Sequence, residues 1–350
     1  MLSPDQTILS VDALNRTFTT SKLLPWQKSH RVHAVSDVSF SVRRGEIVGV
    51  VGESGSGKTT LGRMILKLTN PDSGRVAFQG QDIADVKGHD LTTFRRRMQV
   101  VFQDPYSSLN PRQQISQILT EPLVIHGLAR GRRSERVLEL LSLVDLPPSA
   151  ANRYPHEFSG GQRQRIGIAR ALALEPDFIV ADEPVSALDV SIQAQITALL
   201  ERLQRQLGLS MLIIAHDLAL VQHISHRIIV MYLGKVMEIL PSDDLTTPHH
   251  PYTLALLSAA PRIRTQNRMT KLMLKGDIPS PANPPSGCVF RTRCPFSIDA
   301  CGAAVPQLRT VGRDHLSACI RTDLVRDKSS AWAPGNAAQE NRINMEKGPL

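Results

Sequence analysis

Cysteine is absent from the first 287 residues of this 350-residue chain. The four cysteines all lie in the last quarter, at Cys288, Cys294, Cys301 and Cys319. Cysteines confined to one region argue against a disulfide framework that spans the chain. They indicate a local site instead.

Aromatic residues are scarce, at 4% of the chain, and no long basic run is interleaved with them. The formal net charge of +9 could favour nucleic acid, an anionic membrane face or nucleotide phosphates. The lack of interleaved aromatics disfavours a dedicated nucleic-acid binder. Long apolar runs are missing too: none approaches the roughly 20 apolar residues that cross a bilayer, and residues 1–10 lack the pattern of a signal peptide. We therefore expect a cytoplasmic chain whose transmembrane partners, if any, are other polypeptides.

A glycine-rich segment near the start matches the P-loop pattern: Gly52, Glu53, Ser54, Gly55, Ser56, Gly57, Lys58 and Thr59. The apolar run 47–51 before it predicts a buried strand. The apolar spacing of Leu61, Met64, Ile65 and Leu68 after it predicts an amphipathic helix that ends near Pro71. In such a loop the backbone N–H groups form an anion nest, Lys58 reaches the β- and γ-phosphates, and Thr59 ligates Mg²⁺. Thr60 is included in the predicted ATP site.

Two further apolar runs end in polar side chains. Residues 178–181 lead into Asp182 and Glu183, and residues 211–215 lead into His216. A predicted helix with one apolar face separates them, so the pattern indicates an α/β fold with a largely parallel sheet covered by helices. The carboxylates are then expected at the tip of a buried strand, beside the P-loop.

The chain divides into four predicted regions. Residues 1–90 and 174–245 form the ATP-binding core, and residues 91–173, mostly helical segments broken by prolines, form an inserted helical subdomain. Residues 246–325 form a cysteine-containing extension that includes a proline-rich strap over residues 278–287. The polar residues 326–350 are expected to be disordered.

A short motif opens another predicted helix: Ser159, Gly160, Gly161 and Gln162. The helix dipole and its first N–H groups would face an anion. The order and spacing of the P-loop, this motif and the Asp182-Glu183 pair resemble the ATP-binding cassette (ABC) ATPases, a family of P-loop NTPases. The resemblance implies a RecA-like core with added antiparallel strands. It also implies that ATP is held between two subunits, so that this motif contacts the ATP of the partner. A second segment is then expected to cross the dimer interface, and it can also be the N-cap of the next helix, since both roles can hold: Ser186, Ala187, Leu188 and Asp189.

The same resemblance assigns roles at the ATP site. Glu183 is the expected general base, His216 contacts the γ-phosphate and Glu183, and Gln103 touches Mg²⁺ and the attacking water. The predicted catalytic residues are therefore Glu183, His216, Gln103 and Lys58, and the predicted Mg²⁺ ligands are Thr59, Gln103 and, through water, Asp182. Phe18 is the expected adenine-stacking ring, with Trp26 as the alternative and ordinary core packing of Phe18 also open.

Several strings resemble the oligopeptide and dipeptide import branch of the family, and in particular the second ATPase of these permeases: residues 154–158, 185–191, 250–253 and 287–295. The resemblance implies a second ABC ATPase as partner, two transmembrane permeases and an external peptide-binding protein. It places the chain on the cytoplasmic face of the bacterial inner membrane, with no nucleic-acid partner. Import of nickel or another small solute stays open, as does, more remotely, a soluble ABC-type ATPase that acts on nucleic acid or ribosomes.

The cysteines are spaced Cys-x5-Cys-x6-Cys-x17-Cys, and four thiolates can ligate a [4Fe-4S] cluster or a tetrahedral Zn²⁺. The spacing itself fits neither a bacterial ferredoxin run nor a zinc ribbon. The family resemblance favours the cluster, and zinc, unligated thiols and disulfides remain alternatives.

Overall fold

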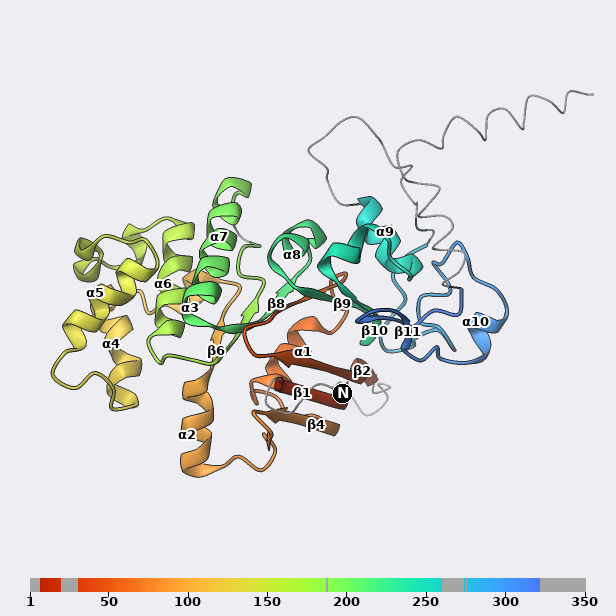
Figure 1. Ribbon diagram of the computed structural model, residues 1–350, viewed down its shortest axis with the longest axis horizontal. Coiled ribbons are helices and arrows are strands. Elements are labelled where there is room, and N and C mark those ends of the chain that lie inside the picture. The colour runs from red at the N-terminus through yellow and green to blue at the C-terminus, as the bar shows by residue number, and fades with distance from the viewer. Residues whose placement is uncertain (1–6, 20–30, 187, 260–273, 275, 322–350) are drawn as a thin grey trace, which may run out of the picture.

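The computed structural model describes residues 7–19, 31–186, 188–259, 274 and 276–321. Three predictions fall outside these residues and stay untested: the role of Trp26, the interface role of Ala187 and the disordered tail. Two sheets organise the described part, with helices packed around them (Figure 1). Within these ranges, no helix is both long enough and apolar enough to cross a membrane.

The larger sheet has the strand order β11-β12-β10-β9-β3-β8-β7-β6. Its parallel part consists of β6 (Met98–Val101), β7 (Phe178–Asp182), β8 (Ser210–Ala215), β3 (Ile47–Val51) and β9 (Arg227–Tyr232). Strands β3 and β8 are buried along their whole length, as expected of parallel strands covered on both faces. Because these strands run in the same direction, the loops after β3, β6, β7 and β8 meet at one edge of the sheet.

The smaller sheet is antiparallel, in the order β2-β1-β4-β5. Its strands are β1 (Thr7–Thr19), β2 (Arg31–Arg43), β4 (Ser73–Phe78) and β5 (Gln81–Asp82). Along β2, Val38, Phe40 and Val42 are buried while Ser39 is exposed, which is the alternation of a strand with one covered face. Helix α1 (Lys58–Ile65) contacts β2, β7 and β8 and so lies between the two sheets.

Helix α1 is shorter than its apolar spacing predicts. It ends at Ile65 rather than near Pro71, and Leu68 is 55% exposed instead of lying on the buried face. The physical reason is local: Lys67 has a positive φ of 53°, a left-handed conformation that cannot continue a right-handed helix.

The helical region lies at one end of the molecule in Figure 1. It comprises α3 (Pro105–Ser108), α4 (Ile115–Ile125), α5 (Arg133–Leu143), α6 (Gly160–Leu172) and the 3₁₀ turns Pro148–Asn152 and Pro155–Glu157, with α7 (Val190–Leu207) alongside. The predicted helical span 91–173 contains one unexpected element, because β6 follows α2 (Gly88–Arg97) and joins the core sheet beside β7.

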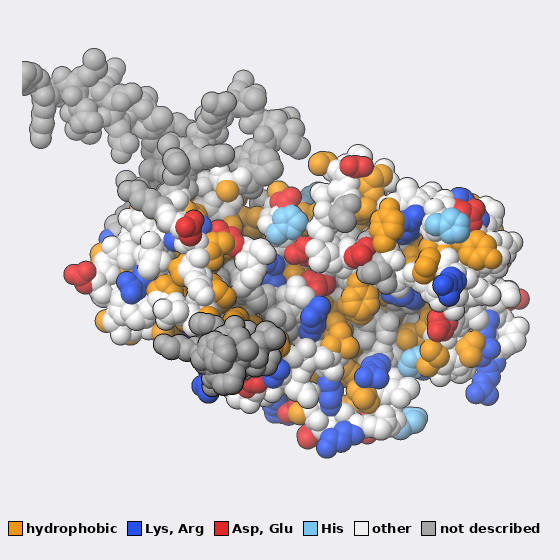
Figure 2. Space-filling view, turned by 180° about the vertical axis from the view of Figure 1, so that it is seen from behind, with side chains coloured by type: hydrophobic (Ala, Val, Ile, Leu, Met, Phe, Trp, Pro, Cys, Tyr) orange, Lys and Arg blue, Asp and Glu red, His pale blue; other side chains and the backbone are white. Residues whose placement is uncertain are grey.

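The carboxy-terminal extension is built onto the core sheet. Strand β12 (His315–Ser317) pairs with β10 (Lys235–Pro241), and β11 (Arg309–Gly312) pairs with β12, so two extension strands complete the large sheet. Helix α8 (Leu218–Ile224) and the 3₁₀ turn Ser242–Thr246 precede the extension, whose helices are α9 (Pro251–Ala259) and α10 (Ala300–Ala303). The face turned away in Figure 1 carries Lys and Arg side chains scattered among acidic and apolar ones rather than gathered in one stripe (Figure 2).

Candidate active site

The P-loop follows β3 and leads directly into α1, as the sequence predicts. Two of its glycines are sterically required. A Cβ on Gly52 would lie 2.1 Å from the carbonyl oxygen of Met231, and one on Gly57, which has φ 100°, would lie 2.0 Å from that of Ala34. The loop is therefore fitted tightly between β9 and β2, and only glycine permits this approach.

Lys58 lies inside the P-loop and is only 5% exposed. Its Nζ donates to the carbonyl oxygens of Gly52 at 2.7 Å and Glu53 at 3.0 Å, and to Ser56 Oγ at 3.3 Å. Burial lowers the pKa of Lys58, although the nearby carboxylates of Glu183, Asp182 and Glu53 act in the opposite direction. The ammonium group is thus held where the loop can present it to an anion.

Asp182 ends β7 and faces the start of α1. The hydroxyl of Thr59 donates to Asp182 Oδ1 at 3.2 Å, so the two oxygens predicted to serve Mg²⁺ are neighbours. The pKa of Asp182 is raised, first by burial and further by the charge of Glu183. A hydroxyl beside carboxylates is a hard, oxygen-only donor set of the kind that Mg²⁺ prefers, so these residues fit the ion.

Glu183 is the point where three strand ends converge. Gln103, in the loop after β6, donates from Nε2 to Glu183 Oε2 at 2.9 Å, and Nδ1 of His216, after β8, lies 3.7 Å from the same oxygen. Glu183 has a positive φ of 46°, a strained backbone conformation of the kind that clusters at active sites. Its backbone N–H donates to the carbonyl oxygen of Ile214 at 2.8 Å, which holds it between β7 and β8. The structure thus brings together Lys58, Thr59, Asp182, Glu183, Gln103 and His216.

Two residues of the extension reach the P-loop, and no sequence pattern marked them for this site. Arg293 pairs with the Glu53 carboxylate through NH1 to Oε2 at 2.6 Å and NH2 to Oε1 at 3.1 Å. The hydroxyl of Tyr252, on α9, accepts the backbone N–H of Glu53 at 2.9 Å. Both belong to strings that carry the resemblance to the peptide-import branch of the family.

The motif at residues 159–162 forms the N-terminus of α6. The hydroxyl of Ser159 accepts the N–H of Gln162 at 3.4 Å, and Gln162 Oε1 accepts the N–H of Ser159 at 3.1 Å, which makes a capping box. A Cβ on Gly160 would lie 3.1 Å from Leu188 Cδ2, so the motif packs against the predicted interface segment. In the described residues, no hydrogen bond or ion pair joins the motif to the P-loop of the same chain.

The other residues of the predicted interface segment lie between β7 and α7. Ser186 Oγ donates to the carbonyl oxygen of Glu183 at 3.2 Å, which links the segment to the strand end. Asp189 occupies the N-cap position of α7 without a side-chain capping hydrogen bond. Asp189 is therefore the N-cap residue of α7 by position, but its carboxylate does not cap the helix.

Phe18 lies near the end of β1 and is 40% exposed, so it is not an ordinary core residue. The guanidinium carbon of Arg16 lies 4.8 Å from the centre of its ring. The ring thus presents apolar surface to the outside of the small sheet, and its predicted contact with adenine stays a prediction.

All four cysteines line one small cavity, together with His250 and Phe290 among others. None is in a disulfide, which removes that alternative for these residues. Burial raises the pKa of Cys294 to about 11 and that of Cys319 to about 12, and it also raises the pKa of Cys288. In the part of the chain that the structure describes, however, no three His, Cys, Asp or Glu side chains are arranged as a metal-binding group, so the predicted iron–sulfur cluster is not supported.

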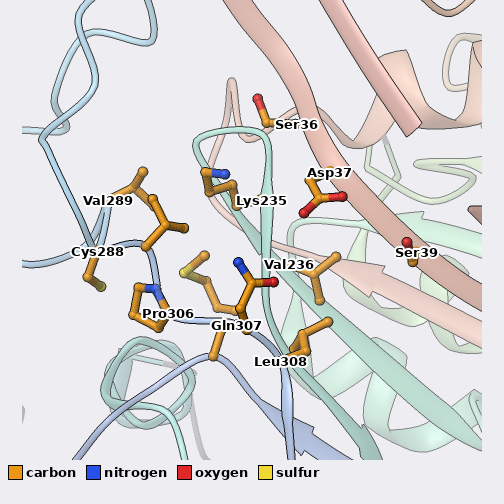
Figure 3. Close-up of a pocket in the computed structure, with 13 residues that line it drawn as sticks. Ser36, Asp37, Ser39, Lys235, Val236, Cys288, Val289, Pro306, Gln307 and Leu308 are labelled. Atoms are coloured by element: carbon orange, nitrogen blue, oxygen red, sulfur yellow. The ribbon is translucent and has the colours of Figure 1, made fainter. Parts of the chain in front are cut away.

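A separate pocket of about 250 Å³ lies where β2, the β9–β10 hairpin and the extension meet. Figure 3 shows Asp37 and Lys235 on one side of it, and Cys288, Val289 and Pro306 on the other. Its lining includes no P-loop residue, so this pocket is distinct from the ATP site.

Comparisons with known proteins identify the family. Residues 35–186 match the family described as ABC transporter, and residues 237–301 match the oligopeptide/dipeptide transporter C-terminal region. A peptide import ATP-binding protein of Brucella ovis is 56% identical over 319 residues, covering 91% of this chain and 98% of the relative. The oligopeptide transport ATP-binding protein AppF of Bacillus subtilis is 50% identical over 319 residues, covering 90% and 97%.

Solved structures show the same fold. The chain CbiO1 of Clostridium perfringens, part of an ABC transporter complex, gives a TM-score of 0.60 at 27% identity, covering 69% of this chain and 90% of that one. The ATP-binding cassette MJ0796, solved as a dimer with ADP and phosphate, gives 0.59 at 30% identity, covering 67% and 99%. These matches confirm the predicted P-loop NTPase fold and family. The chain belongs to the ABC transporter family, among the ATP-binding subunits of the oligopeptide and dipeptide importers, and is an ATPase.

Proposed function

We propose that this ATPase drives the uptake of oligopeptides or dipeptides into a bacterial cell. The convergence of Gln103 and His216 on Glu183, beside the P-loop, carries the part of the proposal that concerns ATP hydrolysis. The names of the relatives and the matched C-terminal region support a peptide as cargo. ATP binding would close a dimer of ATPases, and hydrolysis would reopen it. ATP can shift the permeases between their two states only because it binds the closed dimer more tightly than the open one.

Glu183 is the proposed general base. It is hydrogen-bonded by Gln103 and faced by His216, so its carboxylate is oriented for a water that attacks the γ-phosphate. Lys58 and His216 then supply positive or polar groups toward the developing charge on the phosphoryl oxygens. Gln103 serves as a link between the ATP site and the helical region, because it lies in the loop between β6 and α3.

Thr59 and Asp182, with Gln103 nearby, would hold Mg²⁺. When bound with ATP, the ion neutralises charge on the β- and γ-phosphates. The partly buried Asp182 carboxylate is costly to keep charged without a cation, as its raised pKa indicates, and this supports the assignment.

The remaining site residues are proposed to act across a dimer seam. Apart from the N–H groups that the capping box uses, the first N–H groups of α6 can face an anion. Among the described residues, this helix end makes no polar contact with the P-loop of its own chain. Ser159, Gly160, Gly161 and Gln162 would therefore contact the γ-phosphate held by a second ATPase. Ser186, Leu188 and Asp189 would line the same seam, and the dimeric state of the similar MJ0796 cassette supports this arrangement.

Phe18 is proposed to stack on the adenine ring. Its exposure and its place near the end of β1 in the small sheet support this role. The neighbouring Arg16 guanidinium lies over the ring and pairs with the Asp72 carboxylate at 2.7 Å, so it holds the ring in place.

The proposed partners are a second, distinct ABC ATPase, two transmembrane permeases and an external peptide-binding protein. The proposed location is the cytoplasmic face of the bacterial inner membrane, where the chain would be bound peripherally. Family membership supports these partners, since the peptide importers to which the relatives belong move a solute across a membrane.

Reconstitution tests the proposed cargo. The chain, its partner ATPase and the permeases would be placed in vesicles with the cognate binding protein, and ATP hydrolysis would be measured. We expect peptide-loaded binding protein to stimulate ATP hydrolysis by at least about tenfold, because it favours the closed ATPase dimer in which the barrier to hydrolysis is lower. Stimulation by nickel-loaded but not by peptide-loaded binding protein would replace the peptide with that alternative.

A [4Fe-4S] cluster at the four cysteines remains our proposal on the number and type of donors. Cys288, Cys294, Cys301 and Cys319 supply four sulfurs around one cavity, and a cluster would stabilise the extension by cross-linking it. We expect protein purified without oxygen to contain about four iron and four sulfide ions per chain, with Cys301→Ser lowering both. One zinc ion per chain without sulfide would favour the zinc alternative. Absence of both iron and zinc would indicate that the four cysteines are free thiols.

A further inference from the structure

We propose that the carboxy-terminal extension braces the P-loop through Glu53, and that Arg293 and Tyr252 are positioning residues for ATP binding. This inference rests on the proposed use of the P-loop for ATP. It adds to the ATP site two residues that come from outside the ATP-binding core. Both act on ATP through Glu53, which lies directly after the first glycine of the loop.

The Arg293–Glu53 pair has the geometry of a strong contact. Both guanidinium NH groups bond the two carboxylate oxygens, at 2.6 and 3.1 Å, and the Arg293 side chain is only 9% exposed. Such bidentate pairs fix orientation as well as charge. Arg293 NH1 also lies 3.3 Å from the hydroxyl of Tyr232, which fastens the guanidinium to β9.

Tyr252 fixes the backbone of the same residue. Its hydroxyl accepts the Glu53 N–H at 2.9 Å, and the residue is fully buried. Its ring packs against Tyr232 at 4.7 Å and Phe290 at 5.2 Å between ring centres. The Glu53 N–H is thus committed to α9, and the later N–H groups of the loop remain for phosphate.

The brace and Lys58 hold different atoms of the loop. Lys58 bonds the carbonyl oxygens of Gly52 and Glu53 from inside, whereas Arg293 and Tyr252 hold Glu53 from the extension. When Lys58 turns to the phosphates, it releases these carbonyls. The contacts from the extension then keep the loop in its anion-binding shape.

Charge gives the pair a second effect. Glu53 lies close enough to Lys58 to influence its pKa, so an unpaired Glu53 carboxylate would repel a triphosphate in the loop. Arg293 cancels that charge.

The position of Arg293 depends on the cysteine-bearing loop. Arg293 is adjacent to Cys294, and its N–H donates to the carbonyl oxygen of Phe290 at 3.0 Å. The Cys288 N–H donates to the carbonyl oxygen of Cys301 at 2.8 Å, which closes the loop on itself. A change in the backbone path of this loop would therefore be felt at the P-loop.

The test measures ATP affinity of the full-length chain and KM and kcat of the assembled transporter. We expect Arg293→Gln to weaken ATP affinity and raise KM by about tenfold, with kcat within about twofold at saturating ATP. Tyr252→Phe keeps the ring but loses the acceptor, and we expect a weakening of about threefold. The matched control is Arg291→Gln on the same loop, because Arg291 bonds Ser286 and not the P-loop. The ATP affinity of this variant should equal that of the parent.

The double variant Arg293→Gln with Glu53→Gln separates the effect of the unpaired Glu53 charge from the effect of losing the Arg293–Glu53 contact. It removes the unpaired carboxylate, so we expect ATP affinity to return to within about threefold of the parent. Arg293→Gln and Tyr252→Phe both binding ATP like the parent would overturn the inference, whereas a double variant as weak as Arg293→Gln alone would refute the charge effect and assign the loss to the missing contact. Loss of ATP binding in Lys58→Met together with silent Arg293 and Tyr252 variants would leave the proposed function standing and refute only the brace.

Discussion

Replacing Glu183 by Gln is expected to reduce ATP hydrolysis by at least about a hundredfold while ATP binding is retained. Glutamine keeps the shape of the side chain and can still meet Gln103 and His216, but it cannot take a proton from the attacking water. Because hydrolysis is what reopens the proposed dimer, the variant should also accumulate in the closed, ATP-bound state with its partner ATPase. The backbone strain at Glu183 is unaffected, since both side chains share the same main-chain geometry.

Two measurements check this expectation. Phosphate release by the assembled transporter reports turnover, and light scattering with ATP and Mg²⁺ reports nucleotide-dependent pairing. Glu201→Gln is the matched control, because Glu201 pairs with Arg205 on α7, away from the site, and should leave both readouts unchanged. Hydrolysis by Glu183→Gln at the parent rate would show that another group is the base.

Much of the ATP site was predictable because its signals are local. The run 47–51, the P-loop and α1 follow one another along the chain, and each has its own pattern. Asp182, Glu183 and His216 each follow an apolar run that forms a parallel strand. Parallel strands end at the same edge of a sheet, so the convergence of these side chains followed from topology rather than from spacing.

The features that sequence missed depend on single backbone angles or on distant contacts. The apolar spacing continued to Leu68, but a left-handed Lys67 had already ended α1. Strand β6 has only four residues and directly follows a helix, so it gave no separate signal. Arg293 meets Glu53 across 240 residues of chain, and only the folded extension brings the two together.

Lys58 is the residue whose loss should affect ATP binding most. In the structure it joins three groups of the P-loop, and burial is the largest cause of its lowered pKa. The site therefore keeps an ammonium group where burial disfavours its charge unless an anion is bound beside it. A bound triphosphate would relieve that cost, because it brings the opposite charge to the same place.

Lys58→Met is accordingly expected to weaken ATP affinity by more than about a hundredfold, since it removes the cation that meets the β- and γ-phosphates. Methionine has a similar length and no charge to bury, so the melting temperature of the nucleotide-free chain should change by only about a few degrees. Titration of fluorescent ATP into the full-length chain measures the first effect, and thermal unfolding measures the second. Lys87→Met, in the exposed turn before α2, is the control and should bind ATP like the parent. Affinity within about threefold of the parent in Lys58→Met would contradict the role of this loop in holding the triphosphate.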